Sequence, residues 1–220
     1  METIINFGIP HIAELIFEYV DVGTLLQIRL VSKTWKEIAK SVVLKRWRET
    51  FLMACKIGLI DVVEQILESS DWQTIDLNVT DDQGKTRFML ACQEGRVHVV
   101  KLLLNHPKRE EIEMNLKNDQ GMAAFVLACV NGWQNVVKVL LHHSESHGIN
   151  CSLGLTGFLL ACHKERIDVI KIILEQSLNH NIDFNSQTSF GASAFMLACC
   201  NEDITMVKLL LDHSEKKILI

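Results

Sequence analysis

The pentapeptide Phe88-Met89-Leu90-Ala91-Cys92 decides the fold, because the form Phe-x-x-Ala-Cys occurs five times in the 220-residue chain. The recurring alanines are Ala54, Ala91, Ala128, Ala161 and Ala198. Successive alanines are therefore 37, 37, 33 and 37 residues apart. A step of this size is typical of tandem structural units that stack on one another.

A second apolar pattern follows each alanine at a constant distance, as in Val99-Val100 and Leu103-Leu104 after Ala91. This spacing places the four side chains on one face of a helix. The pentapeptide itself predicts a shorter helix. Glycines are expected to break the two helices apart, and a lysine between the apolar pairs is expected to point to solvent. Five residues are expected near the starts of the second helices, and most of them are candidate N-caps: Asp61, His98, Asn135, Asp168 and Thr205.

Polar segments that contain glycine precede the later copies, and their composition predicts turns. They run from Asn78 to Gly84, Asn115 to Gly121, Asn150 to Gly154 and Asn185 to Gly191. Each unit is thus predicted to be a turn followed by two antiparallel helices, which must stack to bury their apolar faces. The shorter third segment predicts a stunted turn, and therefore a notch in the row of turn tips.

The pattern resembles the ankyrin repeat, Asp-x-x-Gly-x-Thr-Pro-Leu-His-x-Ala. Asp81, Gly84, Thr86, Phe88 and Ala91 match it best. The resemblance implies an all-α solenoid of about five repeats over residues 51–213, divided as 51–78, 79–115, 116–150, 151–185 and 186–213. The chain departs from the pattern at its proline, which is replaced by Arg87, Ala124, Gly157 and Ala194. Without proline or the capping histidine, the first helices are expected to be less rigid at their starts.

Charge and hydrophobicity argue against two classes of binding partner, nucleic acids and membranes. The formal net charge is −5, made up of +1 in residues 1–50 and −6 in the remainder. Nucleic-acid binding needs a basic footprint, so we expect none. No apolar run of about 18 residues occurs, so we expect no membrane span. Five of the seven cysteines recur once per unit. Stacked units would hold them about 10 Å apart, which is too far for a disulfide, so we expect buried free thiols. Free thiols suit a reducing compartment, the cytoplasm or the nucleus.

The segment 8–40 predicts three short helices that carry more apolar residues than they can bury internally, which indicates a covering partner. It resembles the F-box: Pro10, Phe17, Leu25, Val31 and Trp35 are among the residues that match. In that family the apolar face binds the Skp adaptor of a cullin–RING ubiquitin ligase. The residues that the resemblance assigns to this docking are Pro10, Ile16, Phe17, Leu25, Leu26, Val31 and Trp35.

Residues 41–50 contain neither glycine nor proline and predict a stiff helical join, with Val43, Leu44 and Trp47 packed on the first repeat. At the other end, residues 213–220 are expected to begin another inter-repeat loop that is cut off, so that the chain is a fragment or ends without a proper cap. A polar capping helix would be the usual end of such an array.

Sites for chemistry are few. His142, His143, His147 and Cys151 offer metal ligands within a loop, but a structural loop is the simpler interpretation and we expect no metal. Cys200 is expected to be exposed. Asn78, Asn115 and Asn185 resemble asparagines that are hydroxylated in some ankyrin proteins, although a structural role in the turn explains them as well. No catalytic constellation or phosphate-binding loop emerges, so we expect neither catalysis nor a cofactor.

Ankyrin proteins usually contact partners through the turn tips and the outer side of the first helix. The residues that the resemblance places there are Asp82, Gln83, Gln93, Glu94, Asp119, Gln120, Met122, Asn131, His163, Lys164, Phe190, Cys200 and Asn201. Met122 and Phe190 are the apolar anchors predicted among them.

The leading hypothesis is a substrate-recognition subunit of an SCF-type cullin–RING ubiquitin ligase: the F-box would bind the Skp adaptor and the repeats would hold an unknown target protein. The alternative is an ankyrin scaffold or inhibitor whose first helices only cap the solenoid. A pathogen effector is a third idea, disfavoured because known viral proteins of this kind have the reverse domain order.

Overall fold

The computed structural model describes residues 48–68, 76–107, 109–149, 154–180, 187–188 and 191–218. These residues form helices joined by turns, as expected for an all-α repeat array. The first helices of the successive pairs are residues 48–57, α6 (Arg87–Gln93), α8 (Ala124–Asn131), α11 (Gly154–His163) and α13 (Ala194–Cys200). The second helices are α5 (Ile60–Glu68), α7 (Val97–Asn105), α9 (Gln134–His142), α12 (Ile167–His180) and α14 (Ile204–Ile218).

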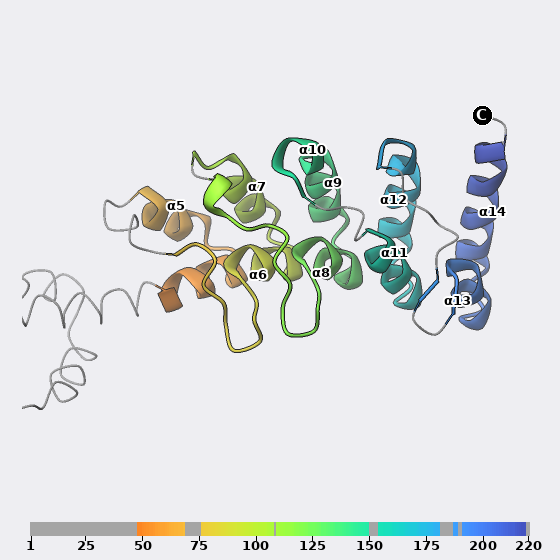
Figure 1. The fold of residues 1–220 in the computed structure, drawn as a ribbon, viewed down its shortest axis with the longest axis horizontal. Helices are drawn as coiled ribbons and strands as arrows, with labels where there is room; N and C mark the ends of the chain where they lie inside the picture. Colours follow the sequence, from red (N-terminus) through yellow and green to blue (C-terminus); the bar gives the residue numbers. More distant parts are fainter. Residues whose placement is uncertain are drawn as a thin grey trace, which may run out of the picture.

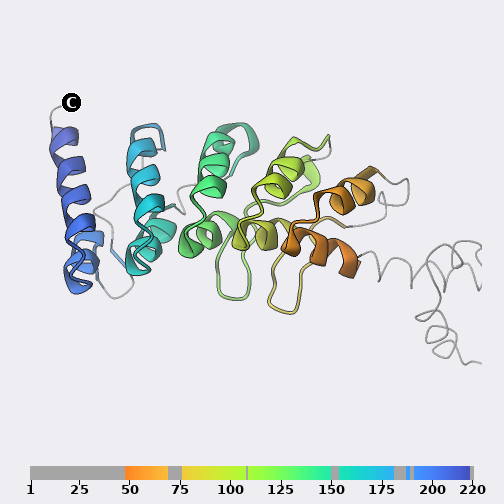
Figure 2. The same cartoon turned by 180° about the vertical axis from the view of Figure 1, so that it is seen from behind.

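The pairs follow one another in chain order, with the first helices in one layer and the second helices in the other (Figures 1 and 2). Two short helices, η2 (Arg109–Glu111) and α10 (Ser144–His147), lie in the connections that leave α7 and α9. The lysine predicted to point outward is exposed in all four copies. Each pentapeptide stands on a first helix, so the sequence pattern correctly located the repeating unit.

A sharp corner joins the two helices of each pair. The corner residues with positive φ are Gly58, Gly95, Gly132, Glu165 and Glu202. The residue after each corner donates its N–H to the carbonyl of the recurring alanine, as Arg96 does to Ala91 at 2.8 Å. The predicted glycine breaks are therefore confirmed, and the last two repeats form the same corner with a glutamate instead.

The predicted caps of the second helices are wrong by two positions. Helix α7 has Arg96 as its N-cap and α9 has Trp133, neither with a side-chain cap bond. The helix starts earlier than expected because the corner already turns the chain, so His98 and Asn135 are second helical residues. Only Asp203, at the same place as Arg96, uses its side chain: its carboxylate accepts from the N–H of Met206 at 3.0 Å.

Some first helices have a side-chain cap although the proline of the repeat pattern is missing. The Thr86 hydroxyl accepts from the N–H of Met89 at 3.2 Å, and the Ser193 hydroxyl accepts from the N–H of Met196 at 3.3 Å. Ala123, the N-cap of α8, has no such bond. Two of the helix starts that we expected to be less rigid thus have a hydrogen-bonded cap.

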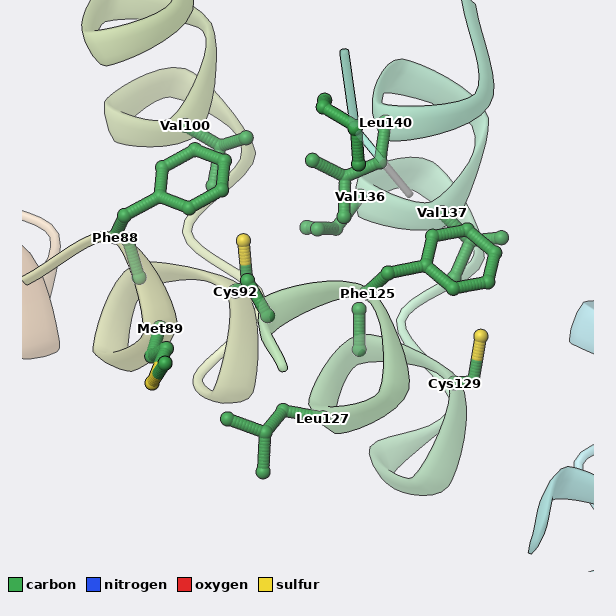
Figure 3. Packing of buried hydrophobic residues seen from close by; sticks show 14 of the residues in the cluster. Phe88, Met89, Cys92, Val100, Phe125, Leu127, Cys129, Val136, Val137 and Leu140 are labelled. Carbon is green, nitrogen blue, oxygen red and sulfur yellow. The ribbon is translucent and has the colours of Figure 1, made fainter. Parts of the chain in front are cut away.

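The core runs through the array as one cluster. In Figure 3, Cys92 lies between α6 and α8, and Leu127 points from α8 towards α6. Across the next junction, a Cβ built on Gly157 of α11 would lie 3.2 Å from the Cys129 sulfur and 3.6 Å from the Phe125 ring. The phenylalanine and cysteine of one repeat thus face the next repeat. The residue that covers them belongs to that next repeat and stands four positions before its recurring alanine, as Gly157 does.

Four of the recurring cysteines are buried free thiols, as predicted: Cys55, Cys92, Cys129 and Cys162. Burial raises the pKa of the Cys55 thiol to about 12, so this residue stays protonated at neutral pH. Cys199 contradicts the prediction, because it is exposed. Among the described residues no further repeat covers that side of α13.

The fourth copy starts differently from its neighbours. Helix α11 already begins at Gly154, whereas α6 and α8 begin four residues before their alanines. Gly154 is therefore helical and not the turn glycine that we predicted. The other residues of the predicted stunted turn, 150–153, lie outside the described part of the chain. Gly157 lets α11 come close to α8, since even a methyl group would press on Cys129.

The end of the chain was also predicted wrongly. Helix α14 continues to Ile218, so most of residues 213–220 extend the last helix and do not begin a loop. The segment contains no glycine or proline, and such a sequence can propagate a helix that packing has already started.

Asparagines link neighbouring repeats along the connections. The Asn78 side chain donates to the carbonyl of Glu111 and accepts from the N–H of Glu113, both at 2.8 Å. Asn115 repeats the first contact one unit later, with the carbonyl of Gly148 at 2.8 Å. The structural role proposed for these residues is thus supported at Asn78 and Asn115, while Asn185 lies outside the described residues.

Replacing Asn78 by alanine should lower the free energy of unfolding by about 1–2 kcal/mol, because two backbone groups of the next repeat lose their partner. Thermal unfolding followed by circular dichroism measures the change. Asn135→Ala, at an exposed asparagine of α9, is the matched control and should have an effect within about 0.5 kcal/mol of zero. Equal effects of the two changes would contradict the role given to Asn78.

Candidate protein-binding surface

Two hairpin turns project beside each other from the layer of first helices (Figures 1 and 2). In the first, the Asp81 carboxylate accepts from the N–H groups of Gln83 and Lys85, each at 2.9 Å. In the second, the Asn118 side-chain oxygen accepts from Gln120 and Met122 at 3.1 and 2.9 Å. A polar side chain at the same position therefore fixes both turns.

The exposed tips of these turns are those predicted to meet a partner: Asp82, Gln83, Asp119 and Gln120. The N–H of Asp119 donates to the carbonyl of Gln83 at 3.2 Å, so a direct hydrogen bond joins the turns. Asp82 and Asp119 give this edge negative charge. The two turns thus form one preorganised polar edge, which lowers the entropy lost when a partner binds.

A third turn, before α13, has the same construction. The Thr188 hydroxyl accepts from the N–H of Ala192 at 3.1 Å, in the role of Asp81. Phe190, one of the two predicted apolar anchors, lies outside the described residues. Met122, the other anchor, is half-buried and packs against the core, so it offers less apolar surface than we predicted.

The residues of the first helices that we predicted to bind a partner differ in their exposure and in their hydrogen bonds. His163, Lys164 and Cys200 are exposed. Asn131 is exposed too, but its amide donates to the Leu127 carbonyl at 2.8 Å. Gln93, Glu94 and Asn201 are half-buried. The Gln93 amide donates to the Glu94 carboxylate at 3.0 Å, and that of Asn201 lies 3.4 Å from the Cys162 carbonyl.

Sequence reasoning missed a ladder of side chains at the corners. In three repeats, the residue five positions after the recurring alanine has a long side chain with an N–H group. This N–H donates to a backbone carbonyl of the preceding repeat, two positions after the alanine of that repeat. The three contacts are Arg96 Nε to Lys56 at 2.9 Å, Trp133 Nε1 to Gln93 at 2.6 Å and Arg166 Nε to Val130 at 3.0 Å. A constant offset with long donor side chains was the signal available in the sequence.

The ladder also explains where the corner glycines occur. Each long side chain lies against the glycine of the preceding corner, as Trp133 lies against Gly95. Asp203 is too short to do so, and the preceding corner residue there is Glu165. Trp133 keeps 43% of its surface exposed, so its ring is both a link between repeats and an apolar feature of the surface.

Arg87, where the repeat pattern has proline, is buried to 1% exposure. Its guanidinium lies 4.7 Å from the centre of the Phe51 ring, and Nη1 donates to the Asp76 carbonyl at 2.9 Å. Nε and Nη2 have no hydrogen-bond partner. Burial lowers the pKa of Arg87 to about 10, which still leaves it charged at neutral pH. This arginine therefore belongs to the junction between repeats and not to the binding surface.

The three histidines that we considered as metal ligands form a ring cluster. His143 lies 5.1 Å from His142 and 4.9 Å from His147, centre to centre. His147 Nε2 lies 3.0 Å from the Leu104 carbonyl, a contact that needs a proton on this nitrogen. In the described part of the chain no group of three or more suitable side chains could hold a metal. Cys151 lies outside that part.

Acidification should destabilise the protein through His143, whose pKa is lowered by burial and then by His147, His142 and Lys101. Because the pKa of His143 is lower in the folded protein, the unfolded chain binds the proton more readily. The contribution of His143 to the free energy of unfolding is therefore fully present above the usual histidine pKa of about 6.5, and it is lost as the pH falls through the lower folded pKa. Melting temperatures measured between about pH 8 and 5 should fall less for His143→Gln than for wild type. His98→Gln, at an exposed site, should follow wild type; identical curves for both variants would contradict the assignment.

Comparison with known families agrees with this architecture. A family model described as ankyrin repeats (3 copies) matches residues 50–153 and 144–219. The chain is an ankyrin-repeat protein. Residues 10–47 match the F-box domain, so the protein joins an F-box to an ankyrin array. No curated protein matches the chain.

The F-box match ends at Trp47, and the ankyrin match begins three residues further on. The F-box match includes all seven residues to which we assigned adaptor docking, from Pro10 to Trp35, and these residues lie outside the described part of this ankyrin-repeat protein. Among the described helices none is long and apolar enough to cross a bilayer.

Proposed function

We propose that this protein is the substrate-recognition subunit of an SCF-type cullin–RING ubiquitin ligase. The observation that carries the proposal is the direct succession of an F-box match, residues 10–47, and an ankyrin match from residue 50. F-box domains generally bind the Skp adaptor, and ankyrin repeats bind proteins. A chain with both modules can hold a target beside the ligase.

The ankyrin array is suited to the target-binding half of this role. Its hairpin tips are exposed, fixed by hydrogen bonds to Asp81 and Asn118, and joined through Asp119 and Gln83. The target would meet these tips and the exposed residues of α8, α11 and α13. Because the edge carries Asp82 and Asp119, we expect a target segment with basic side chains.

In this proposal the chain itself catalyses nothing and needs no cofactor. Its contribution is proximity, because a bound target is held at high effective concentration near the transfer machinery. The proposed location is the cytoplasm or the nucleus, where such ligases act and where the buried thiols would stay reduced.

The test is retention of the full chain by the immobilised Skp adaptor. We expect wild type to be retained and the double variant Pro10→Ala, Leu26→Asp to be lost, since a charge on the docking face cannot be buried without a partner. Asp82→Lys with Asp119→Lys is the control and should keep adaptor binding. If wild type is not retained, the ligase role fails and the ankyrin scaffold or inhibitor remains.

A further inference from the structure

Three large apolar side chains are about half exposed at the corners between the two helices of the first and third pairs. Ile57 is 49% exposed, Leu59 is 48% exposed and Trp133 is 43% exposed. The next repeat packs against each of these corners and still leaves the side chains open. Apolar surface that the array does not bury in its own stacking is available to a partner.

The corner of the second pair connects these exposed residues. Leu59, Arg96 and Trp133 hold the same place in successive repeats, since each donates its backbone N–H to the carbonyl of the recurring alanine, at 2.9, 2.8 and 3.1 Å. A Cβ built on Gly58 would lie 2.8 Å from Cδ of Arg96, and the Trp133 ring lies in the same way against Gly95. The side chains therefore follow one another in a continuous row. We call this row the corner strip, made up of Ile57, Leu59, Arg96 and Trp133.

The indole of Trp133 is exposed but held in place. Its Nε1 donates to the Gln93 carbonyl at 2.6 Å, and its ring lies against Gly95. A side chain that is already fixed loses little conformational entropy when a partner binds. Tryptophan and arginine are also among the residue types most enriched at the energetic centres of interfaces. Trp133 is therefore suited to anchor a partner.

The charged member of the corner strip, Arg96, has no acidic partner within the array. Its Nε donates to the Lys56 carbonyl at 2.9 Å, which leaves the Nη groups for other acceptors. Among the residues that the structure describes, no carboxylate forms an ion pair with it. Glu94, the acid closest to it in sequence, is half-buried and accepts from the Gln93 amide instead. A carboxylate supplied from outside would thus find an exposed cation between apolar neighbours.

We propose that the corner strip binds an extended, acidic segment of a protein partner. Apolar side chains of the segment would contact the two ends of the strip, and a carboxylate between them would pair with Arg96. The strip lies where the first helices end, whereas the acidic hairpin tips precede these helices, so this surface differs from the one proposed for a basic target. The inference does not depend on the ligase role, since a scaffold would use the same strip.

The spacing of the corner strip predicts the sequence pattern of the segment. Successive corners are one repeat apart, about 10 Å for packed helices. A polyproline II segment rises about 3.1 Å per residue and returns to the same face every third residue, so it advances about 9 Å between side chains on one face. We therefore expect an apolar residue, an acid and an apolar residue at positions i, i+3 and i+6. A helix would need about 14 residues to span the same length and would lose more conformational entropy.

Fluorescence polarisation of the labelled peptide Leu-Pro-Pro-Glu-Pro-Pro-Leu with the full chain tests the proposal. Wild type should bind the peptide saturably. Leu59→Asp should weaken binding at least about ten-fold, because a carboxylate replaces an apolar contact and repels the acidic peptide. This variant should fold, since Asp203 holds the same place in the last repeat and caps α14 there. A wild type that does not bind the peptide overturns the proposal.

Ile204→Asp is the matched control, because Ile204 is 68% exposed at the last corner and lies outside the corner strip. It should leave the affinity for the peptide unchanged, and circular dichroism should show both variants folded. If Ile204→Asp weakens binding as much as Leu59→Asp does, the peptide responds to the overall charge of the chain and the corner strip is not its site.

A charge exchange separates binding from the structural role of Arg96. Arg96→Glu should lose the peptide, and a peptide with lysine in place of its glutamate should bind Arg96→Glu more tightly than it binds wild type. If the loss came only from the broken hydrogen bond to Lys56, the exchanged peptide would not restore binding. That result would show that Arg96 does not contact the segment.

Arginine beside tryptophan can also bind single-stranded nucleic acid, through the phosphates and base stacking. A labelled oligothymidylate under the same conditions distinguishes this ligand from a protein segment. We expect no binding, because the chain is acidic overall. Saturable binding that Arg96→Glu abolishes would make the corner strip a nucleic-acid site, and the proposal would be wrong.

Discussion

Replacing Phe125 by alanine should lower the free energy of unfolding by about 3–5 kcal/mol, whereas the same change at Phe195 should lower it by about 1 kcal/mol or less. Both residues stand three before a recurring alanine on a first helix. Phe125 is 2% exposed and lies against α11, while Phe195 is 44% exposed. The difference between the two variants measures what the next repeat contributes to burial.

Urea unfolding followed by far-ultraviolet circular dichroism measures both effects, at protein concentrations where the chain is monomeric. Phe88→Ala, at an equally buried position one repeat earlier, should behave like Phe125→Ala. Because repeat proteins are stabilised by contacts between neighbours, the loss should also broaden the transition if the array begins to unfold in parts. If Phe195→Ala lowered the free energy of unfolding as much as Phe125→Ala, Phe195 would have to be buried in the folded protein, which would contradict the expectation.

The repeating unit and its helices could be predicted from sequence because many residues report them together. The spacing of Ala91 and its counterparts, the apolar pairs and the polar turns all give the same answer. The exposed tips Asp82 and Asp119 followed from the turn composition. Agreement among independent local signals is what makes such a prediction reliable.

Several features that sequence reasoning missed or predicted wrongly have a different cause, namely the contacts between repeats. Arg96 and Trp133 act on the carbonyls of the preceding repeat, about 40 residues away. Arg87 is buried because it lies over the Phe51 ring of the preceding repeat. Cys199 is exposed because no described repeat follows it. None of these environments is visible within a single unit of the sequence, so a pattern read unit by unit cannot show them.

The candidate surface was predicted in outline but not in its balance of polar and apolar groups. The tips are exposed as expected, yet Met122 packs inward and Gln93 is engaged by its neighbours. Trp133, which we did not predict for the surface, is 43% exposed, whereas Phe88, Phe125 and Phe158 are at most 2% exposed. Trp133 therefore adds an exposed apolar ring to a surface whose hairpin tips are acidic.

Replacing Gly95 by alanine should destabilise the protein by about 3 kcal/mol or more, through two separate effects. Gly95 has φ of 69°, a conformation that costs a residue with a side chain about 1–2 kcal/mol. A Cβ there would also overlap the indole of Trp133, with Cε3 2.7 Å away. The Trp133 ring cannot move off without breaking its 2.6 Å hydrogen bond to the Gln93 carbonyl.

Gly121→Ala separates the two effects. Gly121 has nearly the same φ, 74°, but a Cβ there would meet nothing within 4 Å, so this variant should lose only the conformational cost of about 1–2 kcal/mol. A double-mutant cycle isolates the overlap: in a Trp133→Ala background, Gly95→Ala should cost no more than Gly121→Ala. Chemical denaturation of the four chains of the cycle gives the coupling energy. If Gly95→Ala costs the same with and without the tryptophan, the ring does not hold the corner, and the ladder between repeats is only a geometric coincidence.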